Sequence, residues 1–150
     1  MIMLKQNLFC AKCKETDLDK LQKYFVTQKD IVAVYLYGSF ASGNPHKGSD
    51  LDIGVLFDGE VNLYERLGSL YSNFPDLSIK VEPEVRSIGL KESPVFLMNV
   101  IQGRNIYSKN EAARVEFEVN VMNRFYDTQR LRDLDYDYMK KRIREGTYGY

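Results

Sequence analysis

Two apolar runs separated by a polar, glycine-rich loop constrain the fold of this chain more than any other feature. Residues 31–37 form a continuous apolar and β-branched run, and residues 51–57 form a second, largely apolar one. Short runs of this kind are typical of strands that are buried on both faces. Residues 38–49 lie between them and are rich in glycine and serine, which predicts a loop with one helical turn near Phe40 and Ala41. Long polar loops between buried strands often carry function.

Helical and strand patterns alternate along the rest of the chain. Apolar periodicity and capping signals predict helices over about 17–29, 63–71 and 93–103, and a long one from Ser108 onward. Strand character returns at 77–90, where Pro83 excludes a central strand that runs straight through, and at 105–107. The expected core-facing stripe of the long helix is Ala112, Val115, Val119, Met122 and Tyr126.

This order of elements predicts an α/β or α+β fold with a small mixed sheet and helices packed on it. The length of 150 residues is that of one ordinary domain. We expect a single domain over residues 1–150, with its core at about 16–107 and a C-terminal helical segment at about 108–150.

Charge and hydropathy make several classes of function less probable. Twenty-one basic residues balance 21 acidic ones, so the basic excess expected of a protein that grips nucleic acid by its phosphates is absent. The chain also contains no apolar run of the roughly 20 residues needed to span a bilayer. We therefore expect a cytoplasmic protein with no membrane partner, for which nucleic acid is a weaker partner than a small nucleotide or a protein.

The loop and the start of the second apolar run carry the candidate chemistry. Gly38 and Ser39 directly follow a buried strand, where backbone N–H groups and a hydroxyl can bind a phosphate. Asp50 and Asp52 are two residues apart, so in a strand both carboxylates lie on one face. Crowded carboxylates favour a hard cation such as Mg²⁺ or Mn²⁺. The simpler alternative is a turn-rich loop with two solvated aspartates.

These residues resemble the signature of the DNA polymerase beta superfamily of nucleotidyltransferases, in which Gly-Ser precedes Asp-x-Asp by ten residues. The resemblance is closest to the minimal nucleotidyltransferases that act as antitoxins of HEPN-domain toxins. The positions that match the family pattern are Gly38, Ser39, Phe40, Ala41, Gly43, Ser49, Asp50 and Asp52, followed more loosely by Pro94, Gly103, Ile106 and Tyr107.

The resemblance implies an enzyme of the polymerase beta-like nucleotidyltransferase fold that uses ATP and Mg²⁺ (or Mn²⁺). It implies transfer of AMP to a hydroxyl, a tyrosine in the antitoxin group, on a cognate HEPN-type toxin. Asp50 and Asp52 would bind the metal as catalytic residues. Gly38, Ser39 and Ser49 would belong to the nucleotide site.

The third carboxylate of the family pattern is the main departure. Its position falls on Arg86, and an arginine opposes a cation. Glu84 and Glu82 lie two and four residues earlier and share the face of Arg86 in an unbroken strand, although Pro83 can shift the register. We expect Glu84 to be the third catalytic acid and Arg86 to contact a phosphate. The alternative is that these residues form an exposed, charged strand edge.

Other interpretations stay open at this point. The protein could be a degenerate binding module that neutralises a toxin by occlusion alone, or a nucleotidyltransferase for a small molecule such as an aminoglycoside. The basic and tyrosine-rich segment 130–150 indicates either a solvated helix, a protein-docking surface or, more weakly, a nucleic-acid contact. Cys10, Cys13 and His46 are too few for a closed zinc site within one chain.

Overall fold

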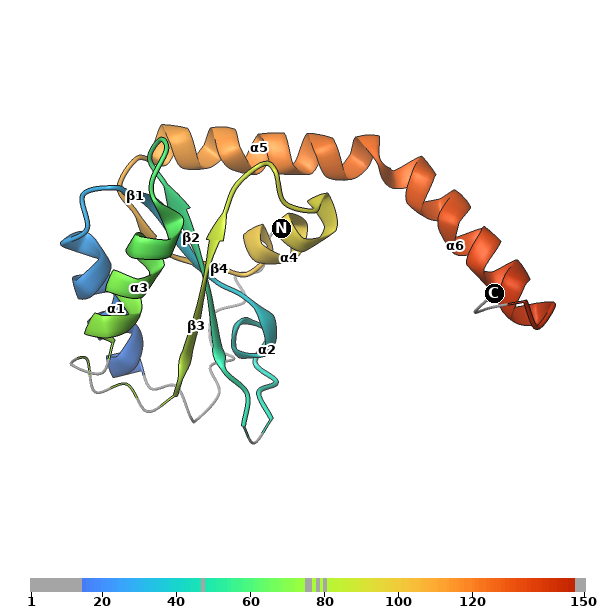
Figure 1. Cartoon of the computed structure of the whole chain (residues 1–150). Coiled ribbons are helices and arrows are strands. Elements are labelled where there is room, and N and C mark those ends of the chain that lie inside the picture. The colour runs from blue at the N-terminus through green and yellow to red at the C-terminus, as the bar shows by residue number, and fades with distance from the viewer. Residues whose placement is uncertain (1–14, 47, 75–76, 78, 80, 148–150) are drawn as a thin grey trace, which may run out of the picture.

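The computed structural model describes residues 15–46, 48–74, 77, 79 and 81–147, and its centre is a four-stranded mixed sheet. The strand order is β3-β2-β1-β4 (Figure 1). β1 pairs antiparallel with β2 and with β4, whereas β2 pairs parallel with β3. The strands are β1 (Ile31–Leu36), β2 (Leu51–Phe57), β3 (Pro83–Ile88) and β4 (Arg104–Ser108). The predicted class, a small mixed sheet with helices packed on it, is therefore confirmed.

The strand β3 begins at the proline that was expected to interrupt it. Pro83 is its first residue and pairs with Leu51 of β2. A proline is tolerated at the first position of a strand because the missing N–H there removes few hydrogen bonds between the strands. The register is therefore continuous from Pro83 to Ile88, without the bulge that the sequence left open.

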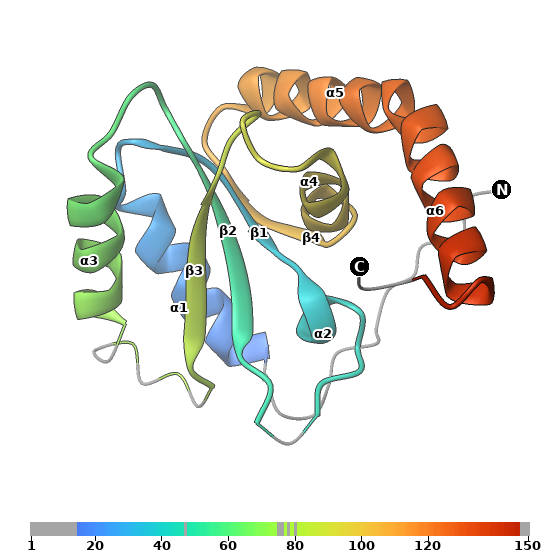
Figure 2. The same cartoon turned by 45° about the vertical axis from the view of Figure 1, so that its right-hand side comes forward.

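Helices cover both faces of the sheet (Figure 2). α1 (Glu15–Val26) and α3 (Leu63–Asn73) pack on one face, and α4 (Pro94–Ile101) and α5 (Glu111–Asp127) pack on the other. The first face buries Leu21 and Phe25 of α1 with Leu70 of α3. The second buries Leu97 of α4 with Phe117 of α5. Both apolar layers depend on β1, whose six residues are all buried.

Two further helices complete the fold. α2 (Gly38–Ala41) is a single turn that follows β1 at once, as expected near Phe40 and Ala41. α6 (Gln129–Arg144) follows α5 after a bend and extends away from the sheet (Figure 1). None of its residues is buried.

The expected core stripe of α5 faces the wrong way. Val115, Val119 and Tyr126 are 43%, 44% and 59% exposed, while Phe117 and Val121 are buried against the sheet. The helix carries two apolar stripes, and the buried one is the one that contacts β1 and α4. Its start also differs, because Asn110 rather than Ser108 accepts the capping hydrogen bond, from the backbone N–H of Ala113.

Gly103 allows α4 to turn directly onto β4. A Cβ atom at Gly103 would lie 2.2 Å from the carbonyl oxygen of Leu36, so no larger residue fits at this crossing. Cys10 and Cys13 lie outside the described residues. Within the described part of the chain, every helix is too short or too polar to cross a bilayer.

Candidate active site

Gly38 brings the loop and the second strand together at one end of the sheet. Its φ of +70° lies in the left-handed region, which only glycine adopts without strain. A Cβ atom at Gly38 would lie 2.2 Å from Oδ2 of Asp52. The backbone N–H of Tyr37 donates to the carbonyl oxygen of Asp52 at 3.0 Å, so β1 and β2 stay paired up to this point. The Asp52 carboxylate therefore lies directly against the first turn of α2.

The loop beyond α2 is closed by its own hydrogen bonds. The N–H of Asn44 and the hydroxyl of Ser42 both donate to the carbonyl oxygen of Ser39, at 3.0 and 3.1 Å. The N–H of His46 donates to Oγ of Ser49 at 2.8 Å, and the Ser49 N–H donates back to His46. Ser49 thus holds the loop shut, whereas the Ser39 hydroxyl has no hydrogen-bond partner among the described residues.

Three carboxylates lie near one another beside this loop. Asp50 immediately precedes β2 and is exposed, and Asp52 is the second residue of β2 and is partly buried. The parallel register places Glu84 of β3 directly opposite Asp52. Burial raises the pKa of Asp52, and the negative charges of Glu84 and Asp50 raise it further. These groups repel one another, and a bound cation would relieve that repulsion.

Arg86 lies two residues beyond Glu84 along β3. It is opposite Gly54, not Asp52, and its Nε is 3.3 Å from Oε1 of Glu84. Its guanidinium also lies over the ring of Phe96 in α4, 5.7 Å from the ring centroid. Its positive charge lowers the pKa of Asp52, against the effect of the two neighbouring acids. Of the two acids that the sequence offered, Glu84 is the one that lies opposite Asp52, whereas Glu82 precedes β3.

The donor set suits a hard cation, although it is not drawn together as a closed site. No three side chains of His, Cys, Asp or Glu are gathered into ligand geometry among the residues that the structure describes. Glu84 turns toward Arg86, so its carboxylate would have to leave that ion pair to join Asp50 and Asp52. All three side chains are carboxylates, the type of oxygen donor that Mg²⁺ and Mn²⁺ prefer.

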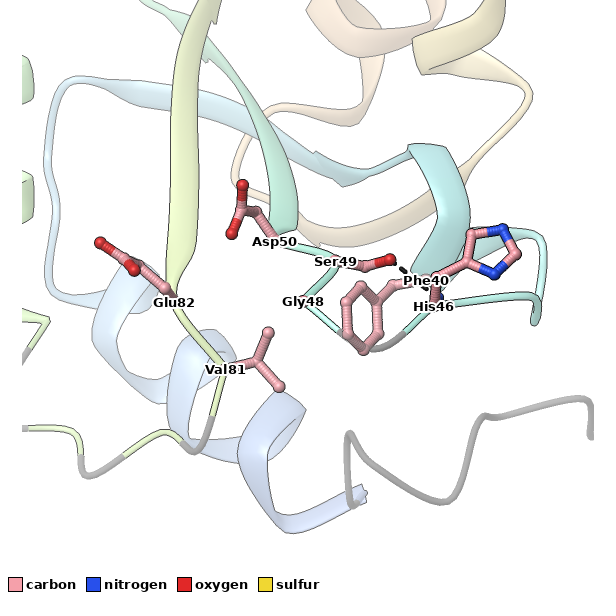
Figure 3. Close-up of a pocket in the computed structure, with 7 residues that line it drawn as sticks. All are labelled: Phe40, His46, Gly48, Ser49, Asp50, Val81 and Glu82. Atoms are coloured by element: carbon pink, nitrogen blue, oxygen red, sulfur yellow. Dashed lines mark hydrogen bonds between the residues drawn. The ribbon is translucent and has the colours of Figure 1, made fainter.

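A hollow of about 360 Å³ opens beside Asp50 (Figure 3). In Figure 3 the carboxylates of Asp50 and Glu82 come from neighbouring chain segments, while Phe40 and His46 line the opposite side. Its volume is in the range of small-ligand pockets. The loop, the start of β2 and the approach to β3 therefore share one concave surface.

Comparison with known proteins identifies the family. The family described as polymerase beta nucleotidyltransferase matches residues 19–112, which is more than half of the chain. This chain belongs to that nucleotidyltransferase family. The matched residues include the Gly38 loop and all of the acids described above. No curated protein matches the chain.

Solved structures with the same fold come from toxin–antitoxin complexes. A MntA–HpeT complex is 22% identical with a TM-score of 0.63, over 85% of this chain and 98% of the other. A toxin–antitoxin complex with AMP-PNP is also 22% identical, with a TM-score of 0.60 over 82% and 98%. The tri-AMPylated Shewanella oneidensis HEPN toxin in complex with MNT antitoxin gives 20% identity and a TM-score of 0.56, over 83% and 96%. At these identities the likeness establishes the fold.

Two aromatic residues of this nucleotidyltransferase belong to the site although the sequence did not single them out. Tyr37 lies opposite Asp52, and its ring meets Phe96 edge-on at 5.7 Å. Burial and then the charge of Asp52 raise the pKa of Tyr37 to about 12. Tyr37 ends the first apolar run and immediately precedes Gly38, which is the signal that could have placed it at the site. Phe96 offered no comparable signal, because only the packing of α4 brings it there.

Proposed function

We propose that this nucleotidyltransferase transfers AMP from ATP to a hydroxyl of a partner protein, using Asp50, Asp52 and Glu84 as its catalytic carboxylates. The observation that carries the proposal is the register of β2 and β3. It sets Glu84 opposite Asp52, and Gly38 holds the Asp52 carboxylate against the glycine-rich loop. Three acids beside a phosphate-binding type of loop suit the transfer of a nucleotidyl group.

In this proposal, the glycine-rich loop binds the triphosphate, and the carboxylates on β2 and β3 lie beside the phosphate that reacts. The Gly38 backbone and the Ser39 hydroxyl, which has no partner among the described residues, would donate to phosphate oxygens, while Ser49 keeps the loop closed around them. Arg86, once released from Glu84, would supply a positive charge to a phosphate. Mg²⁺ held by the carboxylates would neutralise charge on the triphosphate and lower the pKa of the acceptor hydroxyl.

The transfer itself replaces one phosphorus–oxygen bond with another. The acceptor oxygen forms a bond to the α-phosphorus, the bond between the α-phosphorus and the oxygen bridging to the β-phosphate breaks, and pyrophosphate leaves. The acceptor proton would pass to a carboxylate of the cluster, and we assign that role to Glu84. Because Glu84 faces Arg86 in the free protein, ATP would compete with Glu84 for that arginine.

The proposed acceptor is a tyrosine of a cognate HEPN-type toxin, so that AMP transfer makes the chain an antitoxin. The proposal draws support from the structural neighbours, which include a complex with AMP-PNP and an AMPylated HEPN toxin bound to its MNT antitoxin. A reaction that consumes ATP would place the protein in the cytoplasm.

A second candidate is favoured by the Glu84–Arg86 ion pair. If this pair persists when nucleotide binds, the third acid is unavailable and transfer fails. The chain would then neutralise its toxin by binding alone. The two candidates differ in one respect that can be measured, because only the enzyme needs its carboxylates for neutralisation.

The test uses a HEPN-type partner with ATP labelled on either the α- or the γ-phosphorus, in the presence of Mg²⁺. We expect label on the partner from the α-position only, and none with the Asp50→Asn/Asp52→Asn variant. Asp58→Asn is the matched control, since Asp58 is exposed at the far end of β2. The Shewanella oneidensis pair serves as the active reference. No label on the partner, together with toxin neutralisation by the folded double variant, would establish occlusion instead.

A further inference from the structure

The hydroxyl of Tyr71 binds both backbone groups of one residue of β3. Tyr71 lies on α3, and its Oη accepts a hydrogen bond from the N–H of Val85 at 2.7 Å. The same hydroxyl lies 3.3 Å from the carbonyl oxygen of Val85, to which it donates. One side chain thus satisfies a donor and an acceptor of the same peptide segment. Tyr71 also meets Phe74 edge-on, with 6.1 Å between the ring centroids, which sets the direction of its ring.

Val85 connects this hydroxyl to the charged residues of β3. It stands between Glu84 and Arg86, and β3 is an edge strand of the sheet that the described residues form. The outer N–H and C=O groups of an edge strand have no neighbouring strand to bind, and they are free to move unless a side chain covers them. Tyr71 provides that cover at the single peptide segment that carries Glu84 on one side and Arg86 on the other.

We propose that Tyr71 is a positioning residue, which holds the edge strand so that Glu84 stays opposite Asp52. This inference rests on the proposed function, because it gives Tyr71 a role only if Glu84 is a working carboxylate. Tyr71 acts through the backbone of Val85 and contacts neither ATP nor the acceptor. The side chains that orient metal-binding and catalytic groups commonly change affinity or rate by about 10- to 100-fold when they are removed.

The substitution Tyr71→Phe removes the hydroxyl and keeps the ring on Phe74. Tyr64→Phe is the matched control, because Tyr64 is on the same helix and is 91% exposed. We expect the Val85 amide of Tyr71→Phe to exchange its hydrogen faster, by NMR, and Mn²⁺ to bind roughly tenfold more weakly. In the transfer assay, kcat should fall by about the same factor, with KM for ATP little changed. Tyr64→Phe should match the wild type throughout.

A double-mutant cycle separates positioning from a general loss of stability. If Tyr71 acts through Glu84, Tyr71→Phe adds no further loss of Mn²⁺ affinity or kcat to Glu84→Gln. If the losses of Mn²⁺ affinity and kcat caused by the two substitutions add in full, Tyr71 has only a structural role and the proposal is wrong. An unchanged hydrogen-exchange rate of the Val85 amide in Tyr71→Phe would also overturn it. A wild type that binds Mn²⁺ but transfers no AMP would overturn the proposed function alone, and the Mn²⁺ affinities would still test Tyr71. A wild type that binds no Mn²⁺ would overturn both.

Discussion

The substitution Gly38→Ala tests how closely the loop and the acids depend on each other. The backbone of Gly38 has a φ of +70°, and the added methyl carbon would start 2.2 Å from Oδ2 and 3.1 Å from Cγ of Asp52. The methyl group cannot share that space with the carboxylate. The Asp52 side chain must therefore rotate away, or the first turn of α2 must move.

Gly38→Ala should have two effects, backbone strain and displacement of the Asp52 carboxylate, and their magnitudes can be separated. The left-handed conformation costs a non-glycine residue about 1–2 kcal/mol. For a domain of this size, that corresponds to a fall in Tm of roughly 2–8 °C. The displaced carboxylate adds a loss of function, and we expect affinity for Mn²⁺ with ATP to fall at least tenfold, because a proposed metal ligand has left its position.

Gly59→Ala separates the backbone strain from the displacement of the carboxylate. Gly59 has a nearly identical φ of +72°, and a Cβ atom there would meet nothing within 4 Å. We therefore expect Gly59→Ala to lose a similar amount of stability and to bind Mn²⁺ with ATP as tightly as the wild type. Thermal unfolding measures the first quantity, and Mn²⁺ titration followed by electron paramagnetic resonance measures the second. Equal binding by the two alanine variants would refute the steric link between Gly38 and Asp52.

Three further predictions concern Asp52, Asp30 and Gly103. Without metal, Asp52→Asn should stabilise the protein near neutral pH. The pKa of Asp52 is raised in the folded state, so the wild type loses stability as the pH rises from the pKa of the unfolded chain through that of the folded one. The extra stability of the variant in urea denaturation should therefore vanish below about pH 4, where the aspartate is protonated in both states. Asp30→Asn should do the reverse, destabilising by roughly 1–3 kcal/mol at neutral pH and less in acid, since the hydrogen bond from Arg66 lowers the pKa of Asp30. Gly103→Ala should cost about 1–3 kcal/mol in thermal unfolding through its collision with a backbone carbonyl, whereas Gly89→Ala, with open space around it, should cost less.

The sheet was largely predictable because its strands are marked by their own residues. β2 was expected at 51–57 and is observed at Leu51–Phe57, where an apolar run is bounded by a polar loop and an Asp-Gly turn. The orientation of α5 was not predictable in the same way. Its two apolar stripes are comparable in the sequence, and only the contacts with the sheet decide that Phe117 is buried and Val119 is not.

The site shows the same division between local signals and tertiary contacts. Gly38, Asp50 and Asp52 could be selected because their spacing places a loop and two acids together. Glu84 was expected as the third acid, but the sequence could not decide between Glu84, Glu82 and no acid at all, since the answer depends on where β3 begins to pair with β2. The structure starts that pairing at Pro83, and the register then places Glu84 opposite Asp52.

Calorimetric titration of a non-hydrolysable ATP analogue with Mg²⁺ tests the proposed metal–nucleotide site without the acceptor or the transfer step. We predict that the wild type and Asp58→Asn bind the analogue only when Mg²⁺ is present, and that folded Asp50→Asn/Asp52→Asn does not bind it. Equal binding by the double variant, or no binding by the folded wild type, would contradict the assignment of these carboxylates to a metal–nucleotide site.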